Sequence, residues 1–216
     1  MKDLTLGGWA ALPANDYHFI TQWRVRGEAQ EVYDILEDAK SLPKWWPSVY
    51  LDVLEIQSGG PDRVDKVVRI EAKGWLPFKL NWHFTVTDSD PPRGFGLKAW
   101  GDLEGTGRWT LEPDGDFVNI TYDWDVRGQK PLLRYTSVFF KPFFAVNHHW
   151  AMAKGEESLK LELERRRAAT EAARALVPAP PPPTPSPPAP VLLGLGLLLT
   201  LFVIGRRRRR KIKYVR

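Results

Sequence analysis

Two adjacent histidines are the side chains best suited to acid–base chemistry at neutral pH. His148 and His149 lie in a segment without turn residues, so one imidazole is expected to face the protein interior and the other solvent. A buried imidazole can act as a general base or hold a carbonyl group, with Tyr122 or Tyr135 placing a proton. A structural histidine bonded to a strand carbonyl fits the same pattern. The two histidines are therefore weak catalytic candidates.

Other catalytic machinery is missing from the sequence. The chain contains no cysteine, which excludes a thiolate nucleophile and a zinc–thiolate site. It has neither a serine nucleophile elbow nor a glycine-rich phosphate loop after a strand. His148 and His149 lack the spacing of a two-histidine metal site, and His18 and His83 are distant in sequence. We therefore expect neither a metal nor a cofactor, and we favour a binding protein over an enzyme.

Large aromatic residues alternate with polar ones along several segments of the chain. Trp82 and Phe84 share one face of a predicted strand, and Tyr122 and Trp124 share one face of another. Trp46, in a short helix between strands, either covers the mouth of a cavity or fills the core. The residues expected to line an apolar cavity are Trp46, Trp82, Phe84, Gly105, Gly107, Trp109, Tyr122, Trp124, Tyr135, Phe139 and Phe143.

Two glycines support the expectation of a cavity. Gly105 and Gly107 fall on the inward face of one strand. Because glycine has no side chain, the pair removes volume from a face that a packed core would fill. We interpret them as the border of a cavity, while a bulge or the close approach of a helix would fill the same space. Tyr135, Phe139 and Phe143 lie near one face of the following helix and are expected to close the cavity.

Periodicity and turn residues define the elements that must position these side chains. Alternation over 19–25 predicts a strand, and helical spacing over 28–39 predicts an amphipathic helix, which a short helix at 41–47 follows. Six further strands are predicted at 51–57, 64–72, 80–88, 94–101, 103–112 and 117–126, separated by turns rich in glycine and proline. Six consecutive strands with tight turns form an antiparallel meander.

The chain changes period after the last strand. Residues 132–176 lack turn residues, with only Pro142 and Gly155 as interruptions, which predicts one long helix bent at Pro142. The fold class is therefore α+β, with a curved antiparallel sheet of about seven strands wrapped around a long C-terminal helix.

Three segments within this order of elements carry a family resemblance. They are Trp45-Trp46-Pro47, Gly101-Asp102-Leu103-Glu104-Gly105-Thr106-Gly107-Arg108-Trp109, and Asn147-His148-His149-Trp150-Ala151-Met152-Ala153-Lys154-Gly155-Glu156-Glu157-Ser158-Leu159. Together they resemble the polyketide cyclase/dehydrase and lipid-transport family of the START-like, helix-grip (SRPBCC) superfamily, over roughly 19–167. The resemblance implies a sheet that grips the helix around a cavity for an apolar or amphipathic molecule. It implies no particular reaction, because the superfamily mixes cyclases, carriers and sensors.

The end of the chain has a different composition. An N-terminal extension (1–18) and the START-like domain (19–176) precede a proline-rich linker (177–190), an uncharged apolar membrane segment (191–205) and a basic tail (206–216). The tail holds eight of the 31 basic residues, and all 26 acidic residues precede the linker. The body is therefore slightly acidic, which argues against a nucleic-acid partner.

The apolar segment predicts a membrane anchor. As a helix it would cover roughly 22 Å of the ~30 Å hydrocarbon core, so it is short for a span. The arginine block should stay cytoplasmic, and the first twelve residues do not form a signal peptide. We expect a membrane-anchored protein with a cytoplasmic body, whose tail either inserts with snorkelling arginines or dips in shallowly. A cleaved C-terminal sorting signal of an exported protein is a further interpretation.

Two functions fit these observations. The first is a membrane-tethered protein that binds or transfers a hydrophobic small molecule or lipid in an internal cavity. The alternative is a cyclase- or aromatase-like enzyme of the cyclase/dehydrase type, acting on a polyketide-like or other apolar substrate. An enzyme needs a buried ionisable group that faces the cavity and a carrier needs none, so the carrier is favoured.

Overall fold

The computed structural model describes residues 15–130 and 137–185, without the side chains of 137–140. By its internal contacts the chain divides into Met1–Thr184 and Pro185–Arg216, and nearly all described residues belong to the first unit. No helix among the described residues is long and apolar enough to cross a membrane. The predicted membrane segment and basic tail lie outside the described residues.

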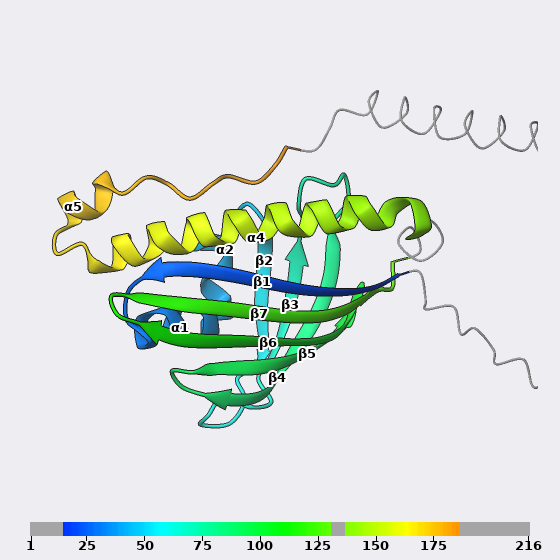
Figure 1. Ribbon diagram of the computed structural model, residues 1–216, viewed down its shortest axis with the longest axis horizontal. Coiled ribbons are helices and arrows are strands. Elements are labelled where there is room, and N and C mark those ends of the chain that lie inside the picture. The colour runs from blue at the N-terminus through cyan, green and yellow to red at the C-terminus, as the bar shows by residue number, and fades with distance from the viewer. Residues whose placement is uncertain (1–14, 131–136, 186–216) are drawn as a thin grey trace, which may run out of the picture. The chain divides into compact units, whose positions relative to one another are not determined.

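Seven strands form one antiparallel sheet (Figure 1). They are β1 (Asp16–Arg26), β2 (Tyr50–Gln57), β3 (Val67–Ala72), β4 (Leu80–Asp90), β5 (Gly94–Gly101), β6 (Leu103–Asp114) and β7 (Phe117–Gly128). The strand order is β1-β7-β6-β5-β4-β3-β2, so the six later strands form the predicted meander and the first strand pairs with the last. The expected alternation holds along β7, where Val118, Ile120, Tyr122, Trp124 and Val126 are all buried.

Three short helical elements connect the first two strands. They are α1 (Ala29–Glu37), the 3-10 helix η1 (Ala39–Ser41) and α2 (Leu42–Trp45). At the start of α1, the Glu31 side chain accepts a hydrogen bond from the Glu28 backbone N–H, as in a capping box. Val32 and Ile35 from α1 and Trp45 from α2 are almost fully buried. These helices therefore close one end of the sheet.

The C-terminal helix is shorter than predicted. It ends at Arg167 as α4 (Ser137–Arg167), and a separate helix α5 (Glu171–Leu176) follows. Thr170 divides the two, because its extended backbone cannot continue a helix and its hydroxyl accepts the Ala173 N–H at 3.1 Å as the N-cap of α5. The prediction of one helix through 176 is therefore wrong. The break is not visible in the sequence, because 168–170 contain neither glycine nor proline.

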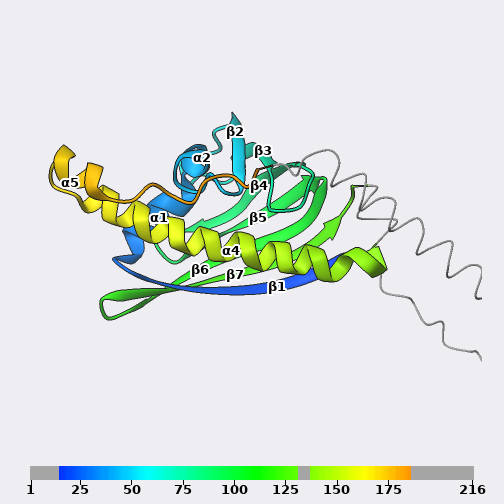
Figure 2. The same ribbon diagram turned by 90° about the horizontal axis from the view of Figure 1, so that it is seen from above.

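The long helix lies across the covered face of the sheet, as Figures 1 and 2 show from two directions. Phe144, Met152, Leu159 and Leu163 of α4 are buried on that side. At Gly155 the helix backbone meets the Trp46 indole directly, since a Cβ at this position would lie 2.3 Å from Trp46 Cζ2. The curved sheet and the long helix confirm the helix-grip architecture.

Candidate functional site

A small hollow lies between α4 and the sheet. Its volume is about 100 Å³, and its wall is mostly apolar. The sheet, the segment after α2 and the loop after β3 supply Trp46, Val49, Tyr50, Ala72, Lys73, Gly74, Leu80, Trp82, Leu103, Tyr122 and Trp124. The helix α4 supplies Phe144, Asn147, His148, Ala151 and Met152. The hollow therefore lies between the sheet and the long helix that the sequence predicted to enclose a cavity.

A second, deeper hollow of about 40 Å³ lies towards α1 and η1. Leu36, Ala39 and Leu42 line it from the helices, and Phe84, Phe95, Leu97 and Trp109 line it from the sheet. The side chains of Trp46, Tyr50, Trp82 and Tyr122 line both hollows. These four aromatic side chains, which we call the aromatic partition, stand between the two spaces.

The aromatic partition is held by further rings. Trp46 contacts Trp23 edge-on with ring centroids 5.5 Å apart, and it contacts Tyr50 edge-on at 5.1 Å. Tyr122 stacks on Trp109 at 4.1 Å, with an angle of 18° between the ring planes. Because Trp46 Nε1 is buried and has no hydrogen-bond partner among the described residues, the wall carries an unused donor.

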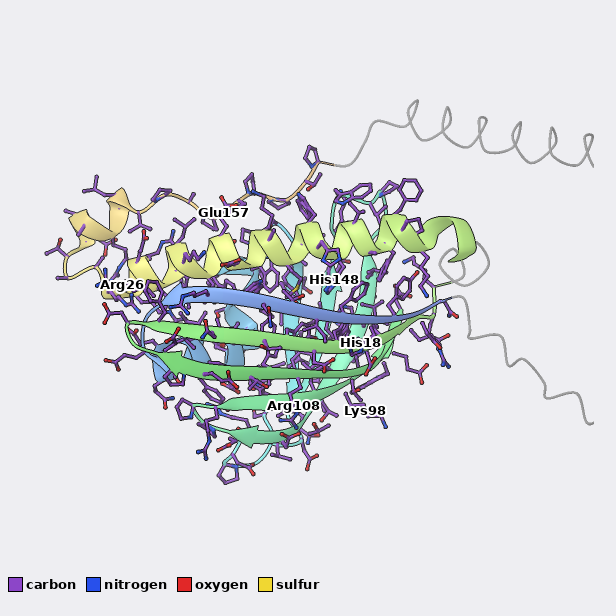
Figure 3. All side chains as sticks on the ribbon, in the orientation of Figure 1. His18, Arg26, Lys98, Arg108, His148 and Glu157 are labelled. Atoms are coloured by element: carbon purple, nitrogen blue, oxygen red, sulfur yellow. The ribbon has the colours of Figure 1, made fainter. Side chains whose placement is uncertain are left out.

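His148 brings an imidazole to the first hollow from α4 (Figure 3). Its ring stacks on Phe19 of β1 with centroids 4.0 Å apart. Burial, with a smaller contribution from the neighbouring His149, lowers the pKa of His148 to about 4, so the ring is neutral at pH 7. Its Nε2 is buried without a hydrogen-bond partner among the described residues. A neutral imidazole with a free ring nitrogen can accept or donate one hydrogen bond.

Two tyrosines add hydroxyl groups to the same wall. Burial raises the pKa of Tyr50 and of Tyr122, so both phenols keep their protons throughout the physiological range. Each is therefore a neutral donor and acceptor that can bond to an oxygen atom of a ligand. His148, Tyr50 and Tyr122 together give the hollow a few polar groups on a predominantly aromatic surface.

The loop after β3 is fixed to α4 beside the hollow. Asn147 is buried, and its Oδ1 accepts the Leu76 N–H at 3.3 Å. Gly74 makes this approach possible, because a Cβ there would lie 2.1 Å from Asn147 Oδ1. Next to it, the buried Lys73 ammonium donates to the Thr184 carbonyl oxygen at 3.0 Å. The wall at this point therefore depends on contacts between the loop, α4 and the residues after α5.

The sequence and the fold agree with a known family. The family described as polyketide cyclase / dehydrase and lipid transport matches residues 19–164, more than half of the chain. The chain belongs to this family. No curated protein sequence matches this family member.

Solved structures share the fold of this family member at low sequence identity. The Zhui aromatase/cyclase from Streptomyces sp. R1128 is 17% identical with a TM-score of 0.58, over 71% of this chain and 97% of that chain. TTHA0849 from Thermus thermophilus is 14% identical with a TM-score of 0.52, over 66% of this chain and 97% of that chain. A START superfamily protein from Mycobacterium smegmatis is 16% identical with a TM-score of 0.51, over 66% and 98%. These likenesses show the START-like fold.

The structure brings together only part of the predicted site of this cyclase/dehydrase family member. Trp46, Trp82, Tyr122 and Trp124 line the first hollow, and Phe84 and Trp109 line the second. Phe143 is 54% exposed, and its neighbour Phe144 faces the sheet instead. His149 is exposed, as expected for one of the two adjacent histidines. Tyr135 and the side chain of Phe139 lie outside the described part of the chain.

The two glycines do not border either hollow. The space beside Gly107 is filled by aromatic rings, since a Cβ there would lie 2.6 Å from Trp124 Cε3 and 2.7 Å from the Tyr122 hydroxyl oxygen. At Gly105 a Cβ would lie 1.9 Å from the Asp125 carbonyl oxygen of the paired strand. The interpretation of these glycines as empty volume is wrong, because neighbouring rings and backbone occupy the space.

Three polar wall residues escaped the sequence analysis. Tyr50, Lys73 and Asn147 line the first hollow, yet none follows the strand alternation that identified the other residues. Tyr50 starts β2 just after the aromatic segment, and Lys73 comes just after β3 ends. Asn147 belongs to the α4 segment that carried the family resemblance, which is the one signal that pointed towards it.

A separate polar cluster lies on β1 and β7, away from the hollow. His18 Nδ1 is 2.7 Å from Asp125 Oδ1 and 3.7 Å from Asp123 Oδ1, and all three side chains are exposed. The hydrogen bond and charge of Asp125 raise the pKa of His18 above its ordinary value. We interpret the cluster as an exposed ionic contact between neighbouring strands.

Proposed function

We propose that this protein binds a hydrophobic small molecule or a lipid in the hollow beneath α4. The observation that carries the proposal is an apolar wall with two buried, unpaired polar atoms, Trp46 Nε1 and His148 Nε2. Buried polar atoms without a partner also occur elsewhere in the described core, Trp23 Nε1 and Trp45 Nε1 among them, so these two atoms support a ligand site because their residues line a hollow. A ligand with an oxygen or nitrogen atom would satisfy them, while its apolar body contacts the surrounding rings.

The size of the hollow limits how a ligand enters. Sites for small molecules usually enclose about 300–1,000 Å³, whereas the hollow has about 100 Å³. We infer that binding turns the aromatic partition, joins the hollow to the second space of about 40 Å³ and also moves other side chains of the wall outwards, because the two volumes together stay below this range. Trp46 lies directly after α2 and outside the strands, and Tyr50 is the first residue of the edge strand β2, so turning these two side chains leaves the centre of the sheet intact.

We further propose that the C-terminal segments tether the domain to a membrane. The uncharged residues 191–205 are followed by eight basic residues, a combination that favours an anionic lipid surface. A tether would hold the domain near bilayer lipids, from which an apolar ligand can be taken or to which it can be delivered.

The binding proposal is tested by filling the hollow from α4. Ala151 lines the hollow, and Ala153 is exposed two residues further along the same helix. Ala151→Leu is expected to weaken binding of the fluorescent probe N-phenyl-1-naphthylamine at least tenfold, and Ala153→Leu is expected to leave it unchanged. Native mass spectrometry of the purified full chain should also show a co-purified apolar molecule. Equal probe affinity of the two variants would show that the hollow is not the site.

A second function, cyclisation or dehydration of an apolar substrate, is favoured by one observation. The neutral His148 and the protonated Tyr50 and Tyr122 line the same hollow, so a base and two acids surround a bound molecule. His148→Phe would then leave unreacted substrate on the protein. Chromatography with mass spectrometry of molecules extracted from the wild type and this variant distinguishes the functions. A dehydration makes the masses differ by one water, a cyclisation without loss of water changes the retention time at equal mass, and a carrier gives identical mass and retention time.

A further inference from the structure

The residues after α5 lie along the outside of the domain. We call residues 177–184 the strap. Proline fixes its own φ near −65° and keeps the residue before it extended, so this run of prolines favours the polyproline II conformation. Val177 is extended, with φ −70° and ψ 126°. Residues 177, 180, 181 and 184 are partly buried while the residues between them are exposed, so one side of the strap faces the domain.

Two side chains of the domain hold the ends of the strap. Arg165 of α4 donates from Nη2 to the Pro178 carbonyl oxygen at 2.8 Å. Lys73, just after β3, donates from Nζ to the Thr184 carbonyl oxygen at 3.0 Å. The strap, orange in Figures 1 and 2, runs beside α4 and passes α2 on its way towards the end of β3. It therefore connects the helix to the sheet on the outside of the grip.

The second of these bonds lies on the wall of the hollow. Lys73 and Gly74 form that wall on the sheet side, and Asn147 and Ala151 form it on the α4 side. Lys73 is buried while the strap is in place, so its bond to the strap lies against the wall of the hollow. A ligand that enters between the β3–β4 loop and α4 would have to displace this contact.

Among the described residues, no hydrogen bond joins 179–183 of the strap to the domain, although Pro180 and Pro181 are partly buried. A shallow hollow of about 620 Å³ lies beneath it near the first bond, lined by Lys44, Glu162, Arg165 and Pro180 among others. A segment with few buried contacts opens at a much lower free energy than the whole fold. The strap can therefore leave the domain while the helix-grip core stays intact.

We propose that the strap is a releasable latch that controls entry of the ligand into the hollow. This inference rests on the proposed binding function. Release also lengthens the tether, because it adds residues 177–184, about 25 Å of polyproline, to the chain between the domain and the membrane segment. Tension on the tail and access to the hollow are thus coupled through the same segment.

Two neighbouring arginines provide a matched test in the full chain. Arg165 bonds both Glu162 and the strap, whereas Arg166 bonds Glu162 through its Nε at 2.8 Å and, within the described part of the chain, makes no hydrogen bond to the strap. Arg165→Met is expected to speed uptake of N-phenyl-1-naphthylamine about fivefold in stopped-flow fluorescence, because a charge-assisted hydrogen bond is lost. Arg166→Met is expected to take up the probe at the wild-type rate.

A second variant removes the stiffness of the strap and keeps every side chain that bonds it. Replacing 180–183 by Pro180→Gly, Pro181→Ser, Pro182→Gly and Pro183→Ser is expected to speed uptake in the same direction, since a flexible segment loses more entropy on docking. Probe binding at equal rates in the wild type, Arg165→Met and this variant would overturn the latch alone. Failure of every variant to bind the probe would overturn the proposed binding function, and the latch with it.

Discussion

At the scale of single residues, His148 shows how burial sets chemistry. A histidine in solution exchanges its proton near pH 6.5, but in this protein burial lowers the pKa of His148 to about 4. The ring therefore stays neutral where an exposed histidine would begin to charge. Its ring stacks on Phe19, which restricts the plane of the imidazole, and its buried Nε2 has no hydrogen-bond partner among the described residues. The same burial that makes the ring useful to a ligand costs stability in acid.

The depressed pKa predicts how the unfolding free energy depends on pH. Below about pH 6.5 the unfolded chain binds a proton at this histidine, and the folded protein does not until about pH 4. The contribution of the neutral ring to the free energy of unfolding is therefore complete above pH 6.5. It is lost as the pH falls to about 4, and the free energy of unfolding decreases by about 3 kcal/mol at most. His148→Phe should keep the stacking and remove this loss. Denaturant unfolding between pH 7 and pH 4 measures the difference.

The matched control for this prediction is the exposed neighbour. His149→Phe should keep most of the loss in acid, since burial, the larger cause of the low pKa of His148, is unchanged and only the smaller contribution of His149 is removed. Other groups titrate in this range and affect all three proteins equally, so the comparison between proteins isolates His148. Parallel pH profiles for the wild type and His148→Phe would contradict the assignment of a neutral imidazole held away from water.

At the scale of elements, the packing of α4 against Trp46 depends on a glycine in the helix. Gly155 lets the Trp46 indole contact the helix backbone, and Trp46 in turn forms part of the aromatic partition. Glycine normally weakens a helix relative to alanine. The close approach at this position reverses that preference, because an added methyl group would have to push the indole towards the hollow.

Gly155→Ala is therefore expected to destabilise the protein. The added Cβ would lie 2.3 Å from Trp46 Cζ2, and overpacking of this kind costs about 1–3 kcal/mol. Ala153→Gly, at an exposed position of the same helix, is expected to cost about 1 kcal/mol through helix propensity alone. Thermal and denaturant unfolding of both variants give the comparison. An increase in stability in Gly155→Ala would mean that the indole does not lie against the helix.

The sequence predicts the elements better than the contacts between them. Strand alternation depends on local spacing, so the inward faces of β4, β6 and β7 are predicted correctly at Trp82, Trp109 and Trp124. Whether a glycine leaves a void depends on rings from another strand, and those rings fill the space at Gly107. The break after Arg167 likewise depends on a cap at Thr170 that carries no strong local signal. Lys73 and Asn147 line the hollow because the fold brings the loop after β3 next to α4, and no periodicity in the sequence identifies them.

At the scale of the whole molecule, charge and hydropathy are unevenly divided along the chain. The eight basic residues of 206–216 follow directly on the uncharged residues 191–205, while every acidic residue precedes 177. Attraction to an anionic surface therefore depends on the tail, and the slightly acidic remainder opposes it. Each basic residue near such a surface contributes about 1 kcal/mol, and salt screens this attraction within a Debye length of about 8–10 Å.

This division predicts how the full chain partitions with vesicles. We expect it to sediment with vesicles of phosphatidylcholine and phosphatidylglycerol, and removal of 191–216 should leave the protein in the supernatant. Replacing Arg206 to Arg210 by glutamine separates the two contributions, because the apolar segment stays and most of the positive charge is lost. Because Lys211, Lys213 and Arg216 remain, that variant should prefer anionic over neutral vesicles less than the wild type does, and its binding should depend less on salt. Sedimentation of the shortened chain with vesicles to the same extent as the full chain would place membrane attachment in the domain, and the strap would then have no tether to lengthen.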